Sequence, residues 1–137
     1  MTAFSDVTAR IPHRAPWLLL DSVLATEPTR VTSQRRLSVG DPLLSDGLAE
    51  TLMVEALAQT AACLVGKERG THQGYLVALQ GFRFHRRGQA GETLACEAER
   101  TAVLGNLHRF TGRIRSDGEV LCEGQMTFAI VPGEAQP

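Results

Sequence analysis

Glu55 and Gln59 are the two residues of this chain whose types and spacing best suit chemistry. They lie four positions apart in the apolar stretch GDPLLSDGLAETLMVEALAQTAACLVG, residues 40–66. On a helix such residues share one face, so the Gln59 amide could orient the Glu55 carboxylate by a hydrogen bond. Burial in such a helix would raise the pKa of the carboxyl group toward working pH, as acid–base catalysis requires. The structural alternative is a carboxylate that only pairs with a neighbouring subunit.

The residues around Glu55 predict a long helix over residues 48–69. Ala, Leu, Met, Glu and Gln dominate this segment, and no proline interrupts it. Apolar residues lie on nearly every side, which is typical of a helix at the centre of a domain. Asp46 or Gly47 could cap the helix at its start.

The rest of the chain predicts strands, at residues 17–25, 30–39, 75–85, 92–103, 107–115 and 119–131. Gly105-Asn106 and Asp117-Gly118 supply the positive φ angles that tight hairpins require. In the last strand, apolar and polar residues alternate. Residues 1–10 and 133–137 are expected to be a loose lead-in and a frayed tail. A sheet that wraps a central helix in this order is an α+β hot-dog fold.

Composition fits one globular domain, residues 1–137, with its core at about 11–131. The chain has 137 residues, 43% of them hydrophobic, and this modest size favours an oligomer. A net charge of -1 gives no indication of nucleic-acid binding, and no apolar run approaches the roughly 20 residues of a membrane span. The scattered cysteines and histidines lack metal-ligand spacing, so no metal site is expected. The cysteines are interpreted as buried thiols of a cytoplasmic protein.

Three stretches resemble the β-hydroxyacyl-acyl-carrier-protein dehydratases and their relatives in aryl polyene and polyketide clusters. IPHRAPWLLLDSVL at residues 11–24 is similar to the opening pattern of that family. VEALAQ at residues 54–59 resembles its central-helix signature, which contains the catalytic glutamate. FRFHRRGQAGET at residues 82–93 is similar to its strand and following turn. The resemblance implies a hot-dog fold and the dehydration of 3-hydroxyacyl thioesters on an acyl carrier protein, in a fatty-acid or polyketide-type pathway.

One part of the family pattern is missing from this chain. The family carries a His-Phe-Pro-Gly segment before the helix, and its histidine acts with the helix glutamate across the dimer interface. Here residues 41–44 match the lead-in to that segment, but the chain then runs through residues 45–47 directly to the helix. The aryl polyene relatives also have a shorter segment. The resemblance therefore implies a catalytic role for Glu55 without the usual partner.

His13 is the remaining candidate for that partner. It lies in the PHRAP motif between Pro12 and Pro16. It matches a histidine of the family's opening pattern that is not the catalytic one there, so it could act in catalysis or only brace the N-terminal loop. His85 and His108, on predicted strands, and His72, in a predicted loop, are expected at the surface.

Substrate contacts are expected at two places. At the helix start, the backbone N–H groups around Gly47, Leu48 and Leu52 could stabilise an anionic thioester oxygen. Arg83, Arg86 and Arg87 could dock an acidic carrier protein or its phosphopantetheine phosphate, or could be a solvated face. Phe82 and Phe84 are expected to face the core. No cofactor is expected beyond the phosphopantetheine arm of the carrier, or coenzyme A, as part of the substrate.

Three functions remain open from the sequence. The first is a dehydratase-like enzyme centred on Glu55. The second is a non-catalytic or accessory hot-dog subunit that binds acyl chains or pairs with an active homologue, possibilities that the missing histidine favours. The third is an acyl thioesterase, since a helix carboxylate can also activate water. The minimal unit is expected to be a homodimer joined at sheet edges with the pocket at its interface, although a hetero-oligomer with a homologue would also fit.

Overall fold

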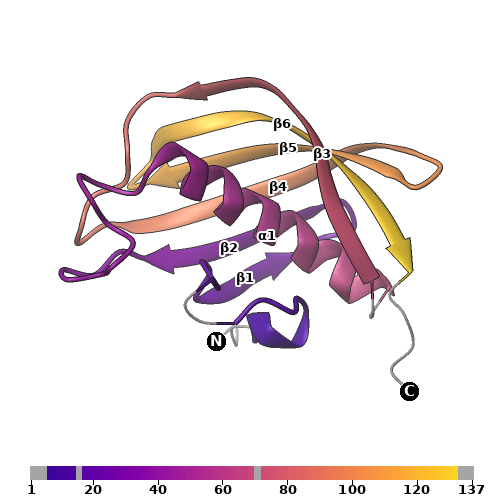
Figure 1. Cartoon of the computed structure of the whole chain (residues 1–137), viewed down its shortest axis with the longest axis horizontal. Helices are drawn as coiled ribbons and strands as arrows, with labels where there is room; N and C mark the ends of the chain where they lie inside the picture. Colours follow the sequence, from indigo (N-terminus) through magenta and orange to yellow (C-terminus); the bar gives the residue numbers. More distant parts are fainter. Residues whose placement is uncertain (1–5, 15–16, 70–71, 133–137) are drawn as a thin grey trace.

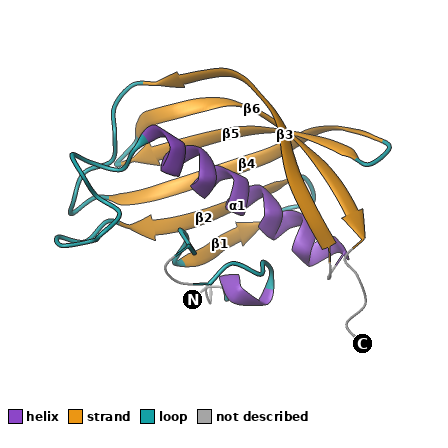
Figure 2. Cartoon of the chain, in the orientation of Figure 1, coloured by secondary structure: helices purple, strands orange, loops and turns teal. Residues whose placement is uncertain are grey.

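A six-stranded antiparallel sheet curls around the helix α1 (Figure 1). The computed structural model describes residues 6–14, 17–69 and 72–132. Along the sheet the strand order is β1-β2-β4-β5-β6-β3. In chain order the elements are η1 (Val7–Ala9), β1 (Ser22–Thr26), β2 (Arg30–Arg36), α1 (Glu50–Arg69), β3 (His72–Phe84), β4 (Thr93–Leu104), β5 (Leu107–Ser116) and β6 (Glu119–Pro132). This arrangement confirms the predicted α+β hot-dog fold (Figure 2).

Both predicted hairpins are confirmed. Gly105 joins β4 to β5 with a φ of 60°, and Asp117 and Gly118 join β5 to β6 with φ angles of 50° and 82°. The alternation predicted for the last strand is also present: Cys122, Met126, Phe128 and Ile130 are buried. These turns fix the register that brings β5 and β6 beneath the helix.

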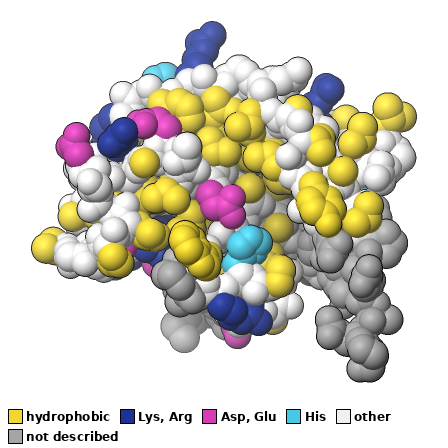
Figure 3. All heavy atoms as spheres, in the orientation of Figure 1, with side chains coloured by type: hydrophobic (Ala, Val, Ile, Leu, Met, Phe, Trp, Pro, Cys, Tyr) yellow, Lys and Arg dark blue, Asp and Glu magenta, His cyan; other side chains and the backbone are white. Residues whose placement is uncertain are grey.

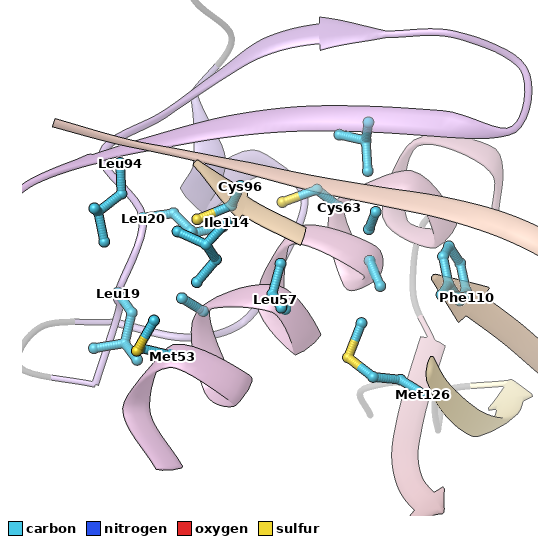
Figure 4. Packing of buried hydrophobic residues seen from close by; sticks show 14 of the residues in the cluster. Leu19, Leu20, Met53, Leu57, Cys63, Leu94, Cys96, Phe110, Ile114 and Met126 are labelled. Atoms are coloured by element: carbon cyan, nitrogen blue, oxygen red, sulfur yellow. The ribbon is translucent and has the colours of Figure 1, made fainter. Parts of the chain in front are cut away.

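The core lies between α1 and the concave face of the sheet (Figure 4). Met53 and Leu57 on the helix, Phe110 on β5 and Met126 on β6 all belong to this core, and all four side chains are fully buried. Phe110 packs edge-on against Phe128 with ring centroids 5.7 Å apart. Helix and sheet therefore share one apolar core.

The three cysteines are free and buried, as the sequence predicted. Burial raises the pKa of each of their thiols to about 12. A thiol with so high a pKa is protonated at neutral pH. In the part of the chain that the structure describes, no helix is long and apolar enough to cross a membrane.

The helix differs from its prediction in two respects. It begins at Glu50, so Asp46 and Gly47 do not cap it; both have positive φ angles, 60° and 84°, in the preceding turn. It is also not buried on every side within one chain. Leu52, Glu55 and two alanines farther along the same stripe are only partly buried, because the sheet covers the opposite side of α1.

The N-terminal segment also differs from its prediction. Strand β1 covers only the end of the predicted strand at 17–25, because backbone groups of Trp17 and Leu19 bond to a side chain of α1 rather than to a strand. Residues 7–9 of the supposed loose lead-in form a short 3₁₀ helix, whose Val7 is buried in the core. Residues 1–5 of that lead-in and the predicted tail lie outside the described residues.

Three further predictions about side chains or segments were wrong. Phe84 is 39% exposed and stacks on Phe82 with centroids 5.8 Å apart, so only Phe82 packs on the core. His108 is fully buried, because its position on β5 alternates onto the concave face with Phe110. His72 is the first residue of β3 rather than part of a loop. His85 is exposed, as predicted.

Candidate functional site

Glu55 and His13 meet on the side of α1 that the sheet leaves uncovered. The Nε2 atom of His13 lies 3.6 Å from Oε1 of Glu55, and their side chains are 33% and 45% exposed. In the single chain the Glu55 carboxylate is therefore half-buried, less than the sequence suggested. Figure 3 shows this face, where an acidic side chain and a histidine lie side by side among hydrophobic ones.

Gln59 holds the Glu55 carboxylate in place, which confirms the predicted i, i+4 hydrogen bond. Its Nε2 donates to Oε1 of Glu55 at 3.0 Å and to the carbonyl oxygen of Trp17 at 2.8 Å. Its Oε1 accepts from the Leu19 amide at 2.9 Å. The side chain is 1% exposed, and these three bonds fix its orientation. The amide hydrogen that points at Glu55 is thereby set by the fold.

His13 presents its Nε2 edge to Glu55 and its other nitrogen to the protein. Nδ1 is buried and has no hydrogen-bond partner among the described residues. Arg14 braces the loop, because its Nη1 donates to the carbonyl oxygens of His13 and Ile11 at 2.8 and 2.9 Å. Within the described residues, no three histidine, cysteine or acidic side chains gather as metal ligands would.

An apolar cavity of about 390 Å³ opens beside this pair. His13, Glu55 and Gln59 line it, and the rest of its wall comes from Pro12 and from residues of α1, β3, β5 and β6. Ala58 and Ala62 could have been anticipated from the sequence, because they follow Glu55 at helical spacing. The strand residues could not, since their placement depends on the sheet order. The other lining residues are Pro12, Ala61, Val65, Gly74, Tyr75, Leu76, Phe110, Phe128 and Ile130.

The predicted backbone donors at the helix start are not arranged as expected. The Leu48 amide donates to the carbonyl oxygen of Gly88 at 2.8 Å, and the Leu52 amide donates to that of Ala49 at 2.9 Å. Gly47 packs against residues 87–89, where an added Cβ would lie 2.7–2.9 Å from three atoms. Leu48 and Leu52 therefore have no uncommitted amide for a thioester oxygen, and none of the three residues lines the cavity.

The predicted arginine cluster divides into two kinds of residue. Arg86 donates to Glu92 at 2.7 Å and to Glu119 at 2.9 Å, and Arg87 forms a two-pronged pair with Glu50 at 2.8 Å. These ion pairs connect the segment after β3 to the start of α1, to the turn before β4 and to the start of β6. Arg83 is exposed and has no ion-pair partner among the described residues. It alone of the three has an uncommitted guanidinium group for an acidic partner.

Replacing Glu92 with glutamine is expected to reduce the acid sensitivity of the fold. Arg86 donates to Glu92, and this contact, with those from Ser116 and Gln89, lowers the pKa of the carboxyl group from 4.5 to about 2. A lowered native pKa stabilises the fold above pH 4.5, and the stabilisation is lost as pH falls toward 2. At pH 7 the free energy of unfolding of the wild type should exceed that of Glu92→Gln by on the order of 2 kcal/mol.

Urea unfolding from pH 7 down to pH 2.5 measures this difference. The gap between the two proteins should shrink through the acid range, whereas Glu99→Gln, on an exposed position of β4, should follow the wild type throughout. A gap that stays constant with pH would contradict the linkage of stability to Glu92.

A curled antiparallel sheet around one helix, with a polar pair in the wall of a largely apolar cavity, defines a hot-dog domain with a candidate site on its helix. The chain belongs to the ApeP-like family of ApeP dehydratases, whose family model matches residues 5–136.

Individual proteins are also similar to this chain. The chain is 33% identical over 134 residues to the 3-hydroxyacyl-[acyl-carrier-protein] dehydratase FabZ of Syntrophomonas wolfei, covering 91% of this chain and 93% of that protein. The dehydratase heterocomplex ApeI:P from Xenorhabdus doucetiae matches with a TM-score of 0.84 and 24% identity, covering 93% of this chain and 91% of that chain. A hypothetical thioesterase with coenzyme A from Streptococcus pneumoniae TIGR4 matches with a TM-score of 0.69 and 11% identity, at coverages of 82% and 87%. The last two matches, at 24% and 11% identity, show only that the fold is shared.

Proposed function

We propose that this protein dehydrates 3-hydroxyacyl thioesters carried by an acyl carrier protein. The observation that carries the proposal is the contact between Glu55 and His13, 3.6 Å apart, in the wall of a largely apolar cavity of about 390 Å³. Family membership and the FabZ relatives, which are 3-hydroxyacyl-[acyl-carrier-protein] dehydratases, support the choice of reaction.

Dehydration needs one group to remove a proton from C2 and another to protonate the leaving hydroxyl at C3. The C2–H and C3–O bonds break, a C2=C3 double bond forms, and water leaves. A substrate placed over the His13–Glu55 pair would present C2 to one group and the C3 hydroxyl to the other. Because the two side chains face each other, the proton gained by the base can return to the acid after turnover. Gln59 acts in this scheme by keeping the Glu55 carboxylate aimed at the cavity.

The acyl chain of the substrate would occupy the apolar cavity. Ala58 and Ala62 lie on the same side of α1 as Glu55, and Ala62 lies about 10 Å farther along the helix axis. Small side chains at these positions keep the cavity open along the helix. The thioester and its phosphopantetheine arm, or coenzyme A, would extend outward as part of the substrate.

Replacing Ala62 with leucine is expected to shorten the cavity. Turnover of a long-chain 3-hydroxyacyl thioester should fall about tenfold in kcat/KM, while 3-hydroxybutanoyl thioester should be processed at close to the wild-type rate. Ala102→Leu, an equivalent change on an exposed position of β4, is the control. Equal losses for both substrates would contradict an acyl chain that runs past Ala62.

The uncovered edge of β3 supports assembly into a dimer, and we propose that the protein acts in the cytoplasm. Tyr75, Leu76, Val77 and Leu79 are 41–56% exposed on this strand, which ends the sheet. Pairing with another hot-dog chain would cover this edge and the open side of α1. The partner would be a second copy or a homologue, as in the ApeI:P heterocomplex. Sedimentation should show an assembly larger than one chain at micromolar concentration, and a folded monomer would contradict this part of the proposal.

Arg83 is the residue proposed to contact the carrier protein. Its exposed guanidinium group suits the acidic surface or the phosphopantetheine phosphate of a carrier. Arg86 and Arg87 are engaged in internal ion pairs and would contribute mainly by holding this end of the sheet in shape.

Product analysis tests the proposed function. The purified protein is incubated with a 3-hydroxyacyl carrier protein, and both enoyl product and free carrier thiol are measured. Enoyl product is the expected result. Free thiol alone would point to a thioesterase, and carrier binding without turnover would point to an accessory subunit; either outcome would overturn the dehydratase proposal.

A further inference from the structure

The N-terminal segment of the chain crosses the uncovered side of α1. This segment, residues 7–14 and 17–20, is called the strap here. Val7 and Ile11 anchor its beginning in the core, where they are 2% and 3% exposed, and Leu19 and Leu20 anchor its end at 4% and 2%. The strap carries His13 between these anchors, so its path over the helix sets the position of the imidazole.

Gly66 provides the first close contact between strap and helix. A methyl group added to Gly66 would collide with the backbone carbonyl oxygen of Arg10. The strap backbone therefore lies directly on the helix backbone at this point, three residues before His13. A glycine in the interior of a helix lowers helix stability, so its presence here is explained by this approach.

Gln59 provides the second contact, from two turns earlier on α1. It accepts the Leu19 amide hydrogen and donates to the Trp17 carbonyl oxygen, while its remaining amide hydrogen reaches Glu55. One side chain thus ties the far end of the strap and the carboxylate to each other. With Gly66 on one side and Gln59 on the other, the segment that bears His13 is held above Glu55.

We infer that His13 of the strap and Glu55 of α1 form a complete acid–base pair within one polypeptide chain, with Gly66 and Gln59 as positioning residues. This inference rests on the proposed function. The family pattern that the sequence resembles implies a histidine from the loop before the helix, acting across the dimer interface. In this chain the strap supplies an imidazole to the glutamate of its own subunit at 3.6 Å. Each subunit then works without a catalytic residue from its partner.

A complementation experiment separates the two arrangements. His13→Gln and Glu55→Gln chains with different tags are co-expressed, mixed assemblies are isolated through both tags, and their turnover is compared with that of each variant alone. The pair within one chain predicts no recovery, because no chain in the mixture has both residues. Recovery to about half of the wild-type rate would overturn the inference. If each site took its histidine from one chain and its glutamate from the other, one of the two sites in a mixed dimer would keep both residues. Full activity of a monomeric wild type would support it.

A readout independent of turnover distinguishes this inference from the proposed function. Imidazole ¹⁵N is introduced into one subunit only of a mixed assembly, or into the whole protein if it is monomeric. The His13 resonance should move when Glu55→Gln is placed in the labelled chain and stay unchanged when it is placed in the unlabelled one. A resonance that moves only when Glu55→Gln is in the unlabelled chain would overturn the inference, even if the wild type were inactive. An inactive wild type with the expected resonances would overturn only the proposed function.

Gly66→Ala tests the positioning role of the strap. Alanine has the higher helix propensity, so α1 should remain fully helical by circular dichroism, while the collision with Arg10 should displace the strap. We expect kcat to fall by about 10- to 100-fold, since small misplacements of catalytic groups have effects of this size, together with a moved His13 resonance. Wild-type kcat with an unchanged resonance would show that the strap does not position His13.

Discussion

Glu55→Gln is expected to reduce dehydration by about 10²- to 10⁴-fold, the range that general acid–base groups contribute. Glutamine has nearly the shape of glutamate and can still accept the hydrogen bond from Gln59, so the helix and the cavity should keep their form. What the variant lacks is a group that gains or releases a proton at working pH. Binding of a 3-hydroxyacyl carrier protein should therefore remain close to wild type while kcat falls.

Steady-state kinetics with a 3-hydroxyacyl carrier protein measure this effect. Glu99→Gln makes the same chemical change on an exposed position of β4 and should leave kcat and KM unaltered. A Glu55→Gln protein that retains more than about a tenth of wild-type kcat would rule out Glu55 as the acid or base. The site would then have to be sought elsewhere in the cavity.

His13→Gln is expected to have an effect of the same order, about 10²- to 10⁴-fold on kcat, although no loop histidine precedes the helix. The imidazole is the titratable group found against Glu55, at 3.6 Å, and the amide cannot replace it in proton transfer. Because the two residues act as one unit, the double variant with Glu55→Gln should be hardly less active than either single variant. A double variant whose loss of kcat equals the product of the two single losses would indicate independent roles.

A second histidine provides a matched control for this prediction. His85→Gln alters an exposed histidine just beyond β3, away from the residues that line the cavity, and should behave as wild type. If His13→Gln lowers thermal stability but leaves kcat intact, His13 only braces the strap, the structural alternative that the sequence left open.

The sequence was informative where local patterns decide structure. The helix was predicted to within two residues at its start, and both glycine-containing hairpins lie where they were expected. The i, i+4 spacing of Glu55 and Gln59 correctly predicted their hydrogen bond, because helix geometry alone brings these side chains together. Local signals of this kind do not depend on the rest of the chain.

Long-range contacts could not be predicted in this way. The bonds of Gln59 to Trp17 and Leu19 join residues 42 and 40 positions apart, and because of them the first part of the strand predicted at 17–25 belongs to the strap instead. The ion pairs of Arg86 and Arg87 likewise depend on segments that meet only in the fold, among them the first residue of α1, Glu50. The sequence of an arginine cluster does not indicate whether carboxylates from distant segments neutralise it.

Deuterium incorporation at C2 tests the central claim most directly. A 3-hydroxyacyl carrier protein is incubated with the wild type in D₂O, and recovered substrate and enoyl product are analysed by mass spectrometry with the position of the label assigned. Reversible dehydration through Glu55 and His13 predicts deuterium at C2 of the recovered 3-hydroxyacyl group, and neither Glu55→Gln nor His13→Gln should incorporate it at a comparable rate. Substrate that binds the wild type but gains no deuterium at C2, or equal incorporation by the variants, would contradict the account.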